Sequence, residues 1–529
     1  MSHLQRLVSD KRLHPALDSP AARQVAAQIG AMTRAEVYPD SLASREGVLF
    51  FLLRRGLAKQ LGLVWARGGQ PTIAQDFAGQ VDTGQAGGLA VQYKVCPTTP
   101  ANAAALRRHL SFTAPVRAGL RRSIGFGDRL GVAGPGHIRA VGSSGVFAVL
   151  AQQSIRELSR TQRTPQEVID AATWGVFEAG WRDGFGADAD HLKTIGDVEA
   201  TLAAGFCMFT IDPSEHVDNA AQSDRPAVVQ AKFERLPWSD LAATGRDYRR
   251  LYLGRSFQVG EGLELQFSEE QLVRAAVKYG GAVAHTARLA GYLSEHAGDN
   301  FELEMSVDET SRPTSVLEHF FVASELKRLG VRWISLAPRF VGEFEKAVDY
   351  KGDLGEFERQ FAEHVQVARH LGPYKISIHS GSDKFSIYPI VARHAGELVH
   401  LKTAGTSYLE ALRVVAMRDP ALFREIFGFA RGRFEQDKAT YHISADVRRI
   451  ADVQRVGDDE LASLLDDGDS RQLLHVTFGS VLTWRSSDGR WLFRDRLLKT
   501  LAENEELHYD LLSRHLARHV GPFAQGPAS

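Results

Sequence analysis

The chain has 529 residues, of which 44% are hydrophobic and 24% are charged. It can therefore bury a large core, and it is not an intrinsically disordered protein. Its 63 lysines and arginines balance 64 aspartates and glutamates, so it lacks the basic excess typical of nucleic-acid-binding proteins. Cys96 and Cys207 are the only cysteines, which is too few for a disulfide framework or a four-thiolate zinc site.

The first residues of the chain have no apolar segment of the kind found in secretory signal peptides. No apolar run approaches the ~18 residues that a transmembrane helix requires. We therefore expect a cytoplasmic protein that has neither a membrane nor a nucleic acid as a partner. The sequence leaves the oligomeric state open, with a homo-oligomer as one option.

Short β-rich runs alternate with amphipathic helical segments between Arg122 and Asp446. This strict alternation predicts an α/β protein with a parallel sheet, and eight strand–helix units predict a (β/α)₈ barrel like that of the TIM fold. An open, doubly wound sheet is the alternative. The predicted strands are 122–131, 188–194, 205–217, 301–309, 331–340, 374–382, 398–405 and 439–446.

The barrel prediction divides the chain into three parts. Residues 121–454 form the catalytic barrel, with an irregular insertion at 218–262. Residues 1–120 contain helical patterns and at least one strand, which we interpret as an N-terminal α/β elaboration. Residues 455–529 end in a helical pattern and form a C-terminal extension.

Alternation of side chains along the predicted strands places many polar groups inside the barrel. In 301–309 the odd positions are apolar, so Glu304 and Asp308 point inward. The same parity turns His379, Lys402 and His442 inward in their strands. In 188–194 it turns His191 and Lys193 inward and Asp190 outward, unless the strand ends at Asp190. Because burying so many polar groups is costly, this set of residues predicts a functional site.

Histidines and carboxylates at the ends of these strands are candidate metal ligands. His379 and His191 would each serve as a ligand, although hydrogen-bonded core histidines are equally consistent with the pattern. Glu343 or Glu345, in the loop after the fifth predicted strand, would supply a third ligand, and Asp308 is the alternative. Mixed histidine and carboxylate ligands suit Zn, Mn, Co, Ni or Fe(II).

Lys402 and Lys193 have two interpretations. They bind a substrate carboxylate, or one of them forms a Schiff base as in some aldolases. Glu304 is either a proton carrier or the buried partner of one of these lysines. The glycines at 125, 127 and 131 miss the dinucleotide-binding spacing, so we expect no nucleotide cofactor.

Several long runs resemble the tagaturonate/fructuronate epimerase family. The resemblance covers roughly residues 120–450, and the runs that carry it are 125–138, 306–350, 375–391 and 400–413. It implies a metal-dependent isomerase that interconverts D-tagaturonate and D-fructuronate, both small sugar acids, in hexuronate catabolism. It also implies a site in which His191, Glu343 and His379 hold the metal and Asp190 and Glu304 transfer protons. The residues that it implies for substrate binding are Lys193, Asp308, Arg339, Ser380, Lys402 and His442.

The implied reaction constrains the mechanism. The two acids differ at C4 in ketose numbering, which is β to the ketone, so enolisation alone does not invert it. Transient oxidation would need a nicotinamide cofactor, and the sequence has no Rossmann fingerprint. Retro-aldol cleavage between C3 and C4, rotation of the aldehyde and re-addition need a base, an acid and a metal.

Other functions also fit these residues. The alternatives are a metal-dependent ketose isomerase or 3-epimerase, a class II-type aldolase acting on a sugar acid, and a Schiff-base aldolase using Lys402 or Lys193. A non-catalytic barrel that only binds a sugar acid is a further alternative, because a fold alone does not decide a function.

Overall fold

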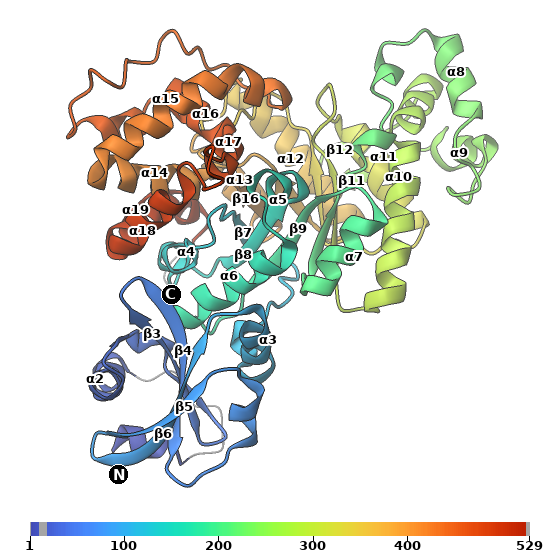
Figure 1. Ribbon diagram of the computed structural model, residues 1–529. Helices are drawn as coiled ribbons and strands as arrows, with labels where there is room; N and C mark the ends of the chain where they lie inside the picture. The colour runs from blue at the N-terminus through green and yellow to red at the C-terminus, as the bar shows by residue number, and fades with distance from the viewer. Residues whose placement is uncertain (1, 10–17, 525–529) are drawn as a thin grey trace.

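The computed structural model describes residues 2–9 and 18–524. Its centre is a closed barrel of eight parallel strands, surrounded by helices (Figure 1). The strand order around the barrel is β10-β13-β14-β15-β16-β7-β8-β9. The predicted (β/α)₈ fold is confirmed. The barrel strands are β7 (Ser123–Phe126), β8 (Phe147–Ser154), β9 (Gly186–Leu192), β10 (Met208–Ile211), β13 (Glu302–Val307), β14 (Ser335–Pro338), β15 (Lys375–Ile378) and β16 (Val399–Thr403).

Each barrel strand is connected to the next one along the chain by one or more helices, as parallel pairing requires. The longest helix, α10, is preceded by two small helices and a two-stranded sheet, which together fill the segment between β10 and β13. The connecting elements are α4 (Gly134–Val141), α5 (Ile155–Thr161), α6 (Pro165–Glu178), α7 (Ile195–Ala204), α8 (Pro226–Glu234), α9 (Gly245–Tyr252), β11 (Phe257–Gly260), β12 (Leu263–Leu265), α10 (Glu269–Ala297), α11 (Val316–Arg328), α12 (Leu354–Leu371) and α13 (Tyr388–Ala395).

The last predicted strand, 439–446, is wrong. These residues form a 3₁₀ turn and a loop, whereas the eighth barrel strand is β8, which the sequence analysis did not identify. Pairing of β16 with β7 closes the barrel, so the barrel has no edge to which a further strand could pair. His442 therefore lies on a loop, not on a strand.

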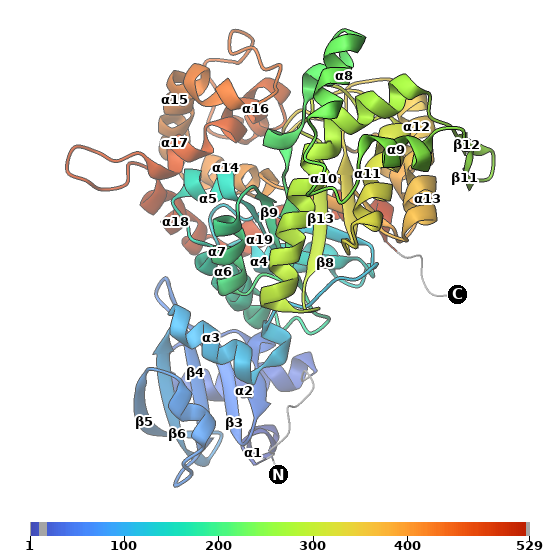
Figure 2. The same ribbon diagram turned by 90° about the vertical axis from the view of Figure 1, so that its right-hand side faces the viewer.

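An antiparallel sheet precedes the barrel and lies beside it at one end of the molecule (Figures 1 and 2). Its strand order is β1-β3-β4-β6-β5, with β2 paired to β3. Helix α3 contacts α6 and joins this sheet to the barrel. The elements are α1 (His3–Leu7), α2 (Ser19–Thr33), β1 (Glu36–Val37), β2 (Ala43–Arg45), β3 (Val48–Arg55), β4 (Ala58–Ala66), β5 (Gln80–Ala86), β6 (Leu89–Pro97) and α3 (Pro100–His109).

Within the described residues, six α-helices follow the last barrel strand and form a layer against one side of the barrel (Figure 1). The last of them, α19, packs against α4 and α14. Within residues 2–9 and 18–524 no helix has both the length and the apolar content needed to cross a membrane. The six helices are α14 (Thr406–Arg418), α15 (Pro420–Asp437), α16 (Gly468–Val476), α17 (Phe478–Thr483), α18 (Arg494–Glu503) and α19 (Glu505–Val520).

The main apolar core lies between the barrel strands and the surrounding helices. On β13 the side chains of Leu303, Met305 and Val307 join this core, as the alternation predicted. Glu304 points the other way and is fully buried inside the barrel. The apolar residues thus hold the fold together from outside the strands, which leaves the interior free for polar groups.

We predict that Leu293→Ala lowers the free energy of unfolding by ~2–5 kcal/mol, the usual range for a buried leucine. Leu293 lies on α10, is completely buried and belongs to the main apolar core. Chemical denaturation measures the loss, and kcat of the folded protein should not change. The exposed neighbour Ser294 provides the control, because Ser294→Ala should change stability by no more than ~0.5 kcal/mol. Equal stability of Leu293→Ala and the unmodified protein would contradict the prediction.

Candidate active site

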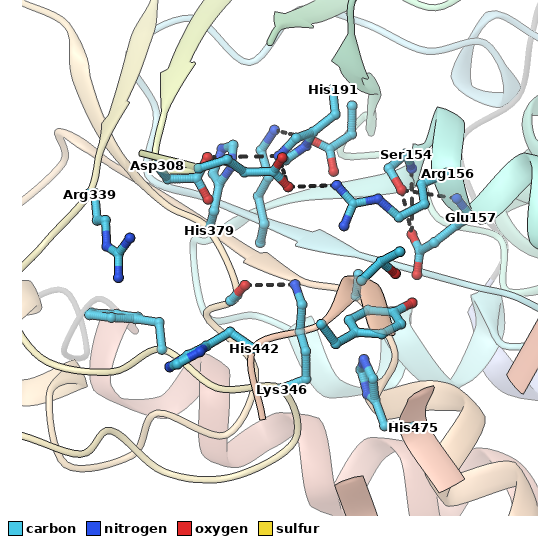
Figure 3. Close-up of a pocket in the computed structure, with 18 of the residues that line it drawn as sticks. Ser154, Arg156, Glu157, His191, Asp308, Arg339, Lys346, His379, His442 and His475 are labelled. Atoms are coloured by element: carbon cyan, nitrogen blue, oxygen red, sulfur yellow. Dashed lines mark hydrogen bonds and ion pairs between the residues drawn. The ribbon is translucent and has the colours of Figure 1, made fainter. Parts of the chain in front are cut away.

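A cavity of about 650 Å³ opens at the carboxyl ends of the barrel strands (Figure 3). This is the end at which (β/α)₈ enzymes place their active sites. Polar side chains from several barrel strands and from the C-terminal segment line it. They are Arg129, Gln152, Ser154, Arg156, Glu157, Asp190, His191, Asp308, Glu309, Arg339, Glu343, Lys346, His379, Ser380, Lys402, Thr440, Tyr441, His442 and His475.

The ammonium group of Lys402 lies between three buried carboxylates at the base of this cavity. Its Nζ is 2.8 Å from Asp188, 2.7 Å from Asp190 and 2.9 Å from Glu304. Burial favours the neutral amine, but the three carboxylates outweigh it and raise the pKa of Lys402 well above its ordinary value. Lys402 is thus a fixed cation that links β16, β9 and β13.

Two histidines and two aspartates gather above Lys402, and we call Asp190, His191, Asp308 and His379 the histidine–carboxylate cluster. One ligand atom from each of Asp190, His191 and His379 lies within 4.8 Å of the others. Asp308 Oδ1 is 3.8 Å from His191 Nε2 and 3.3 Å from His379 Nδ1. Figure 3 shows Asp308, His191 and His379 on the same wall of the cavity.

Each imidazole of the cluster is oriented by a buried carboxylate. His191 Nδ1 is 2.8 Å from Asp190 Oδ1, and His379 Nε2 is 2.6 Å from Glu304 Oε1. The other nitrogen of each ring faces Asp308. Carboxylates that bond the second nitrogen of a ligating histidine are a regular feature of metal sites. The donor set therefore fits a divalent transition metal ion.

The same contacts set the protonation of the histidines. Burial disfavours the imidazolium, but Asp308 and the hydrogen bond to Glu304 raise the pKa of His379 to about 10. Asp190 raises the pKa of His191 in the same way, also against the effect of burial. Without a cation both rings are more basic than usual, so a metal ion would have to displace protons from them.

Two cavity residues have backbone conformations that are rare for side-chain-bearing residues. His191 has φ 56° and Ser380 has φ 50°. Such left-handed residues concentrate at functional sites, where the surrounding structure holds them in place. At His191 the left-handed turn comes just before β9 ends, so Asp190 and His191 both reach the cavity. The alternation that pointed Asp190 outward is therefore wrong, because Asp190 contacts Lys402 inside the barrel.

Lys193 and Glu343 do not reach the cluster. Lys193 lies beyond the turn, outside the cavity lining, and its Nζ is 3.3 Å from Glu215 and 3.7 Å from Asp212. Glu343 lines a different part of the cavity, where it pairs at 2.8 Å with the largely exposed His442. The geometry therefore supports neither the predicted substrate-binding role of Lys193 nor the predicted metal-binding role of Glu343. The alternative ligand Glu345 bonds Lys351 and Gln472 instead of a cluster residue.

Glu304 lies beneath the cluster and is absent from the cavity lining. Its carboxylate bonds Lys402, His379 and Ser335. Burial alone would raise the pKa of Glu304, but Lys402 and His379 lower it well below its usual value. These contacts favour an orienting role for Glu304 rather than direct proton transfer. The other predicted residues, Asp308, Arg339, Ser380 and Lys402, do line the cavity.

Sequence reasoning missed a group of cavity residues that follow β8 or lie on loops. Arg129 bonds Glu157 at 2.9 Å, and Arg156 pairs with Glu309 at 2.6 Å. Lys346 donates a hydrogen bond of 2.6 Å to Ser380 Oγ. Recognition of residues 147–154 as a strand would have placed Arg156 and Glu157 at a strand end.

A second group of potential ligands, Asp383, His515 and His519, lies outside the cavity lining. Both oxygens of Asp383 are engaged, one by His515 at 2.6 Å and one by Arg471 at 2.7 Å. The backbone N–H of Asp383 donates to His519 Nε2. These hydrogen bonds thus occupy the oxygen and nitrogen atoms with which the group would have to ligate a cation. This group fastens the loop after β15 to α16 and α19.

Comparison with known proteins assigns the chain to a family. A family model described as UxaE, tagaturonate epimerase, matches residues 38–522. A tagaturonate/fructuronate epimerase of Thermotoga maritima is 45% identical over 485 residues, which cover 92% of this chain and 96% of the relative.

Solved structures agree with this assignment. The native crystal structure of fructuronate-tagaturonate epimerase UxaE from Cohnella laeviribosi has a TM-score of 0.85 and 39% identity, and the match covers 96% of this chain and 99% of that one. A glycerol complex of the same enzyme has a TM-score of 0.86 and 38% identity over 96% and 99% of the two chains. The resemblance found in the sequence is confirmed, and the chain belongs to the tagaturonate epimerase family.

Proposed function

We propose that this protein interconverts D-tagaturonate and D-fructuronate in hexuronate catabolism, with a divalent metal ion held in the histidine–carboxylate cluster. The names of the relatives support the substrate pair. One observation supports metal binding. His191, His379 and Asp308 lie close together at the open end of the barrel, and a buried carboxylate bonds the second nitrogen of each imidazole.

We assign the metal to His191 Nε2, His379 Nδ1 and the carboxylate of Asp308. Asp190 also lies near both rings, but Oδ1 of Asp190 bonds His191 and Lys402, and Oδ2 accepts from Gln152. Outside the cluster Asp308 accepts a hydrogen bond from Ser306 Oγ, whereas Asp190 is engaged by Lys402 and Gln152, and Asp308 lines the cavity. Two histidines and one carboxylate leave coordination positions open for a substrate. A bound divalent cation would supply Lewis-acid chemistry at the ketone end of the sugar acid.

The reaction at C4 then proceeds by retro-aldol cleavage and re-addition. A cavity base takes the proton of the C4 hydroxyl, the C3–C4 bond breaks, and its electron pair moves to C3. Rotation of the aldehyde followed by re-addition returns the proton, so nothing is consumed. Asp190 and Glu304 are engaged by Lys402 and by one histidine each, so we assign proton transfer to a third carboxylate. Glu309 lines the cavity, 3.8 Å from His191 Nε2, and we assign it this role.

A Schiff base at Lys402 does not fit this site. Nucleophilic attack requires a neutral amine, whereas three carboxylates raise the pKa of Lys402 well above its ordinary value. Lys193 is outside the cavity lining. The ammonium of Lys402 instead keeps Asp190 and Glu304 charged and in place.

We predict that removal of divalent metal with EDTA abolishes epimerase activity and that Mn²⁺, Co²⁺, Ni²⁺ or Zn²⁺ restores it. Because His379 and His191 must lose protons to bind the ion, the apparent metal affinity should rise between pH 6.5 and 9. NMR detection of fructuronate measures activity, and titration calorimetry measures affinity. Full activity in protein shown to be metal-free by elemental analysis would contradict the metal assignment.

We predict different outcomes for two glutamates of the site. Glu309→Gln should lower kcat by ~10²–10⁴ while metal content stays constant, because a proton carrier is lost. Glu304→Gln should lower metal affinity by ~10–100-fold, because it removes the charge that orients His379.

Kinetics, elemental analysis and melting temperature on the same preparations distinguish the two roles. Normal kcat in Glu309→Gln would remove Glu309 from the reaction. A metal-replete, stable Glu304→Gln variant with a large loss of kcat would instead make Glu304 the proton carrier.

We predict that Lys402→Met lowers the free energy of unfolding by ~3–5 kcal/mol, since it leaves three buried carboxylates without their cation. The exposed Lys499 on α18 provides the control, and Lys499→Met should be neutral. Borohydride added during turnover should leave Lys402 unmodified. Substrate-derived mass on Lys402 in a tryptic digest would establish the Schiff-base mechanism that the geometry disfavours.

A further inference from the structure

We propose that Lys346 binds the carboxylate group of the sugar acid and sets the preference for acids over neutral sugars; this inference rests on the proposed function. The starting point is the balance of charge in the cavity. Arg129, Arg156 and Lys402 are each paired with a carboxylate of the protein. Among residues 2–9 and 18–524, no carboxylate lies within 4.0 Å of the charged nitrogens of the other two cavity cations, Lys346 and Arg339.

The backbone around Lys346 is fixed on both sides. Glu345 is buried and bonds Lys351 and Gln472. The carbonyl of Ala347 accepts a hydrogen bond of 2.9 Å from Arg471. The side chain of Lys346 extends from this segment into the cavity (Figure 3). The hydrogen bond to Ser380 Oγ also restrains the side chain of Lys346, which reduces the conformational freedom that it loses when it binds an anion.

The hydrogen bond to Ser380 places the ammonium beside the histidine–carboxylate cluster. Ser380 Oγ accepts one N–H of Lys346 at 2.6 Å, and Ser380 directly follows His379 in the chain. An ammonium has three donors, so two remain for a carboxylate in the cavity. Arg339 is less suited to this role, because one end of its guanidinium is bonded to the carbonyl of Thr310.

Such a site would keep the aldehyde fragment bound while its reacting face is exchanged. In ketose numbering the ketone is C2 and the carboxylate is C6, so the acid has one recognisable group on each side of the C3–C4 bond. When that bond breaks, Lys346 would hold the C4–C6 aldehyde through its carboxylate. Rotation by half a turn about C4–C5 leaves C4 in place and exchanges its oxygen and hydrogen. The aldehyde then presents its opposite face to C3, and re-addition gives the epimer without release of either fragment.

The test compares D-tagaturonate with D-tagatose, which has a hydroxymethyl group in place of the carboxylate. Titration calorimetry on metal-loaded protein gives Kd for each sugar. In the unmodified protein tagaturonate should bind more tightly. Lys346→Met should weaken tagaturonate binding by ~10–100-fold, the usual loss for a hydrogen bond to a charged group, and change tagatose binding by less than ~3-fold. Lys346→Arg should retain part of the preference, and Lys499→Met should behave as the unmodified protein.

The outcomes separate this inference from the proposed function. An unchanged ratio of the two Kd values in Lys346→Met overturns the inference, as does a loss of preference in Arg339→Met alone. Failure of the unmodified, metal-loaded protein to convert tagaturonate overturns the proposed function, and the Kd ratio still decides the role of Lys346. Melting temperature and metal content, measured on every variant, exclude unfolding as the cause. If Lys346→Met does not fold, Lys346→Gln carries the same comparison.

Discussion

The ion cluster around Lys402 is the constraint on which the site depends. Three carboxylates buried in the barrel would be unstable without a cation, and Lys402 lies within 2.9 Å of each. Two of these carboxylates, Asp190 and Glu304, each bond one imidazole of the histidine–carboxylate cluster. A single ammonium group therefore fixes the orientation of both histidines. The polar interior is best understood as the support of the site rather than as the site itself.

The cavity also depends on segments outside the barrel. Asp383, in the loop after β15, is bonded to His515 and His519 of α19 and to Arg471 of α16. The same loop begins with His379 and Ser380. The C-terminal helices thus hold the loop that carries one histidine of the cluster and the hydroxyl that positions Lys346. This explains why the helical layer after β16 is part of the working structure and not only a cover for the barrel.

The strand–helix alternation and the alternation of side chains were enough to predict the barrel and most of its polar interior. Both signals are local, and they were clear on β13, β15 and β16. They failed at two segments, for different reasons. Residues 147–154 form a strand that is buried almost throughout, so it lacks the polar–apolar alternation that marks a strand. Residues 439–446 do alternate, but the closed barrel has no edge with which they could pair.

The errors within the site have a related cause. The parity rule assumes a regular strand, and the left-handed residue His191 ends that regularity. As a result, Asp190 lies inside the barrel, contrary to the parity rule, and Lys193 lies outside the cavity lining. Which carboxylate faces the cavity and which lies beneath it also depends on depth, and alternation along a strand carries no information about depth. Glu304 and Asp308 have the same parity, yet only Asp308 lines the cavity.

Retro-aldol epimerisation in this cavity is tested most directly by the fate of hydrogen on carbon. Metal-loaded protein would be incubated with D-tagaturonate in D₂O, and the product would be followed by NMR. Cleavage and re-addition at C3–C4 predict D-fructuronate with no deuterium bonded to carbon, because only the hydroxyl proton moves. Deuterium at C3 would show that the protein enolises its substrate like a ketose isomerase or 3-epimerase, and would contradict the mechanism.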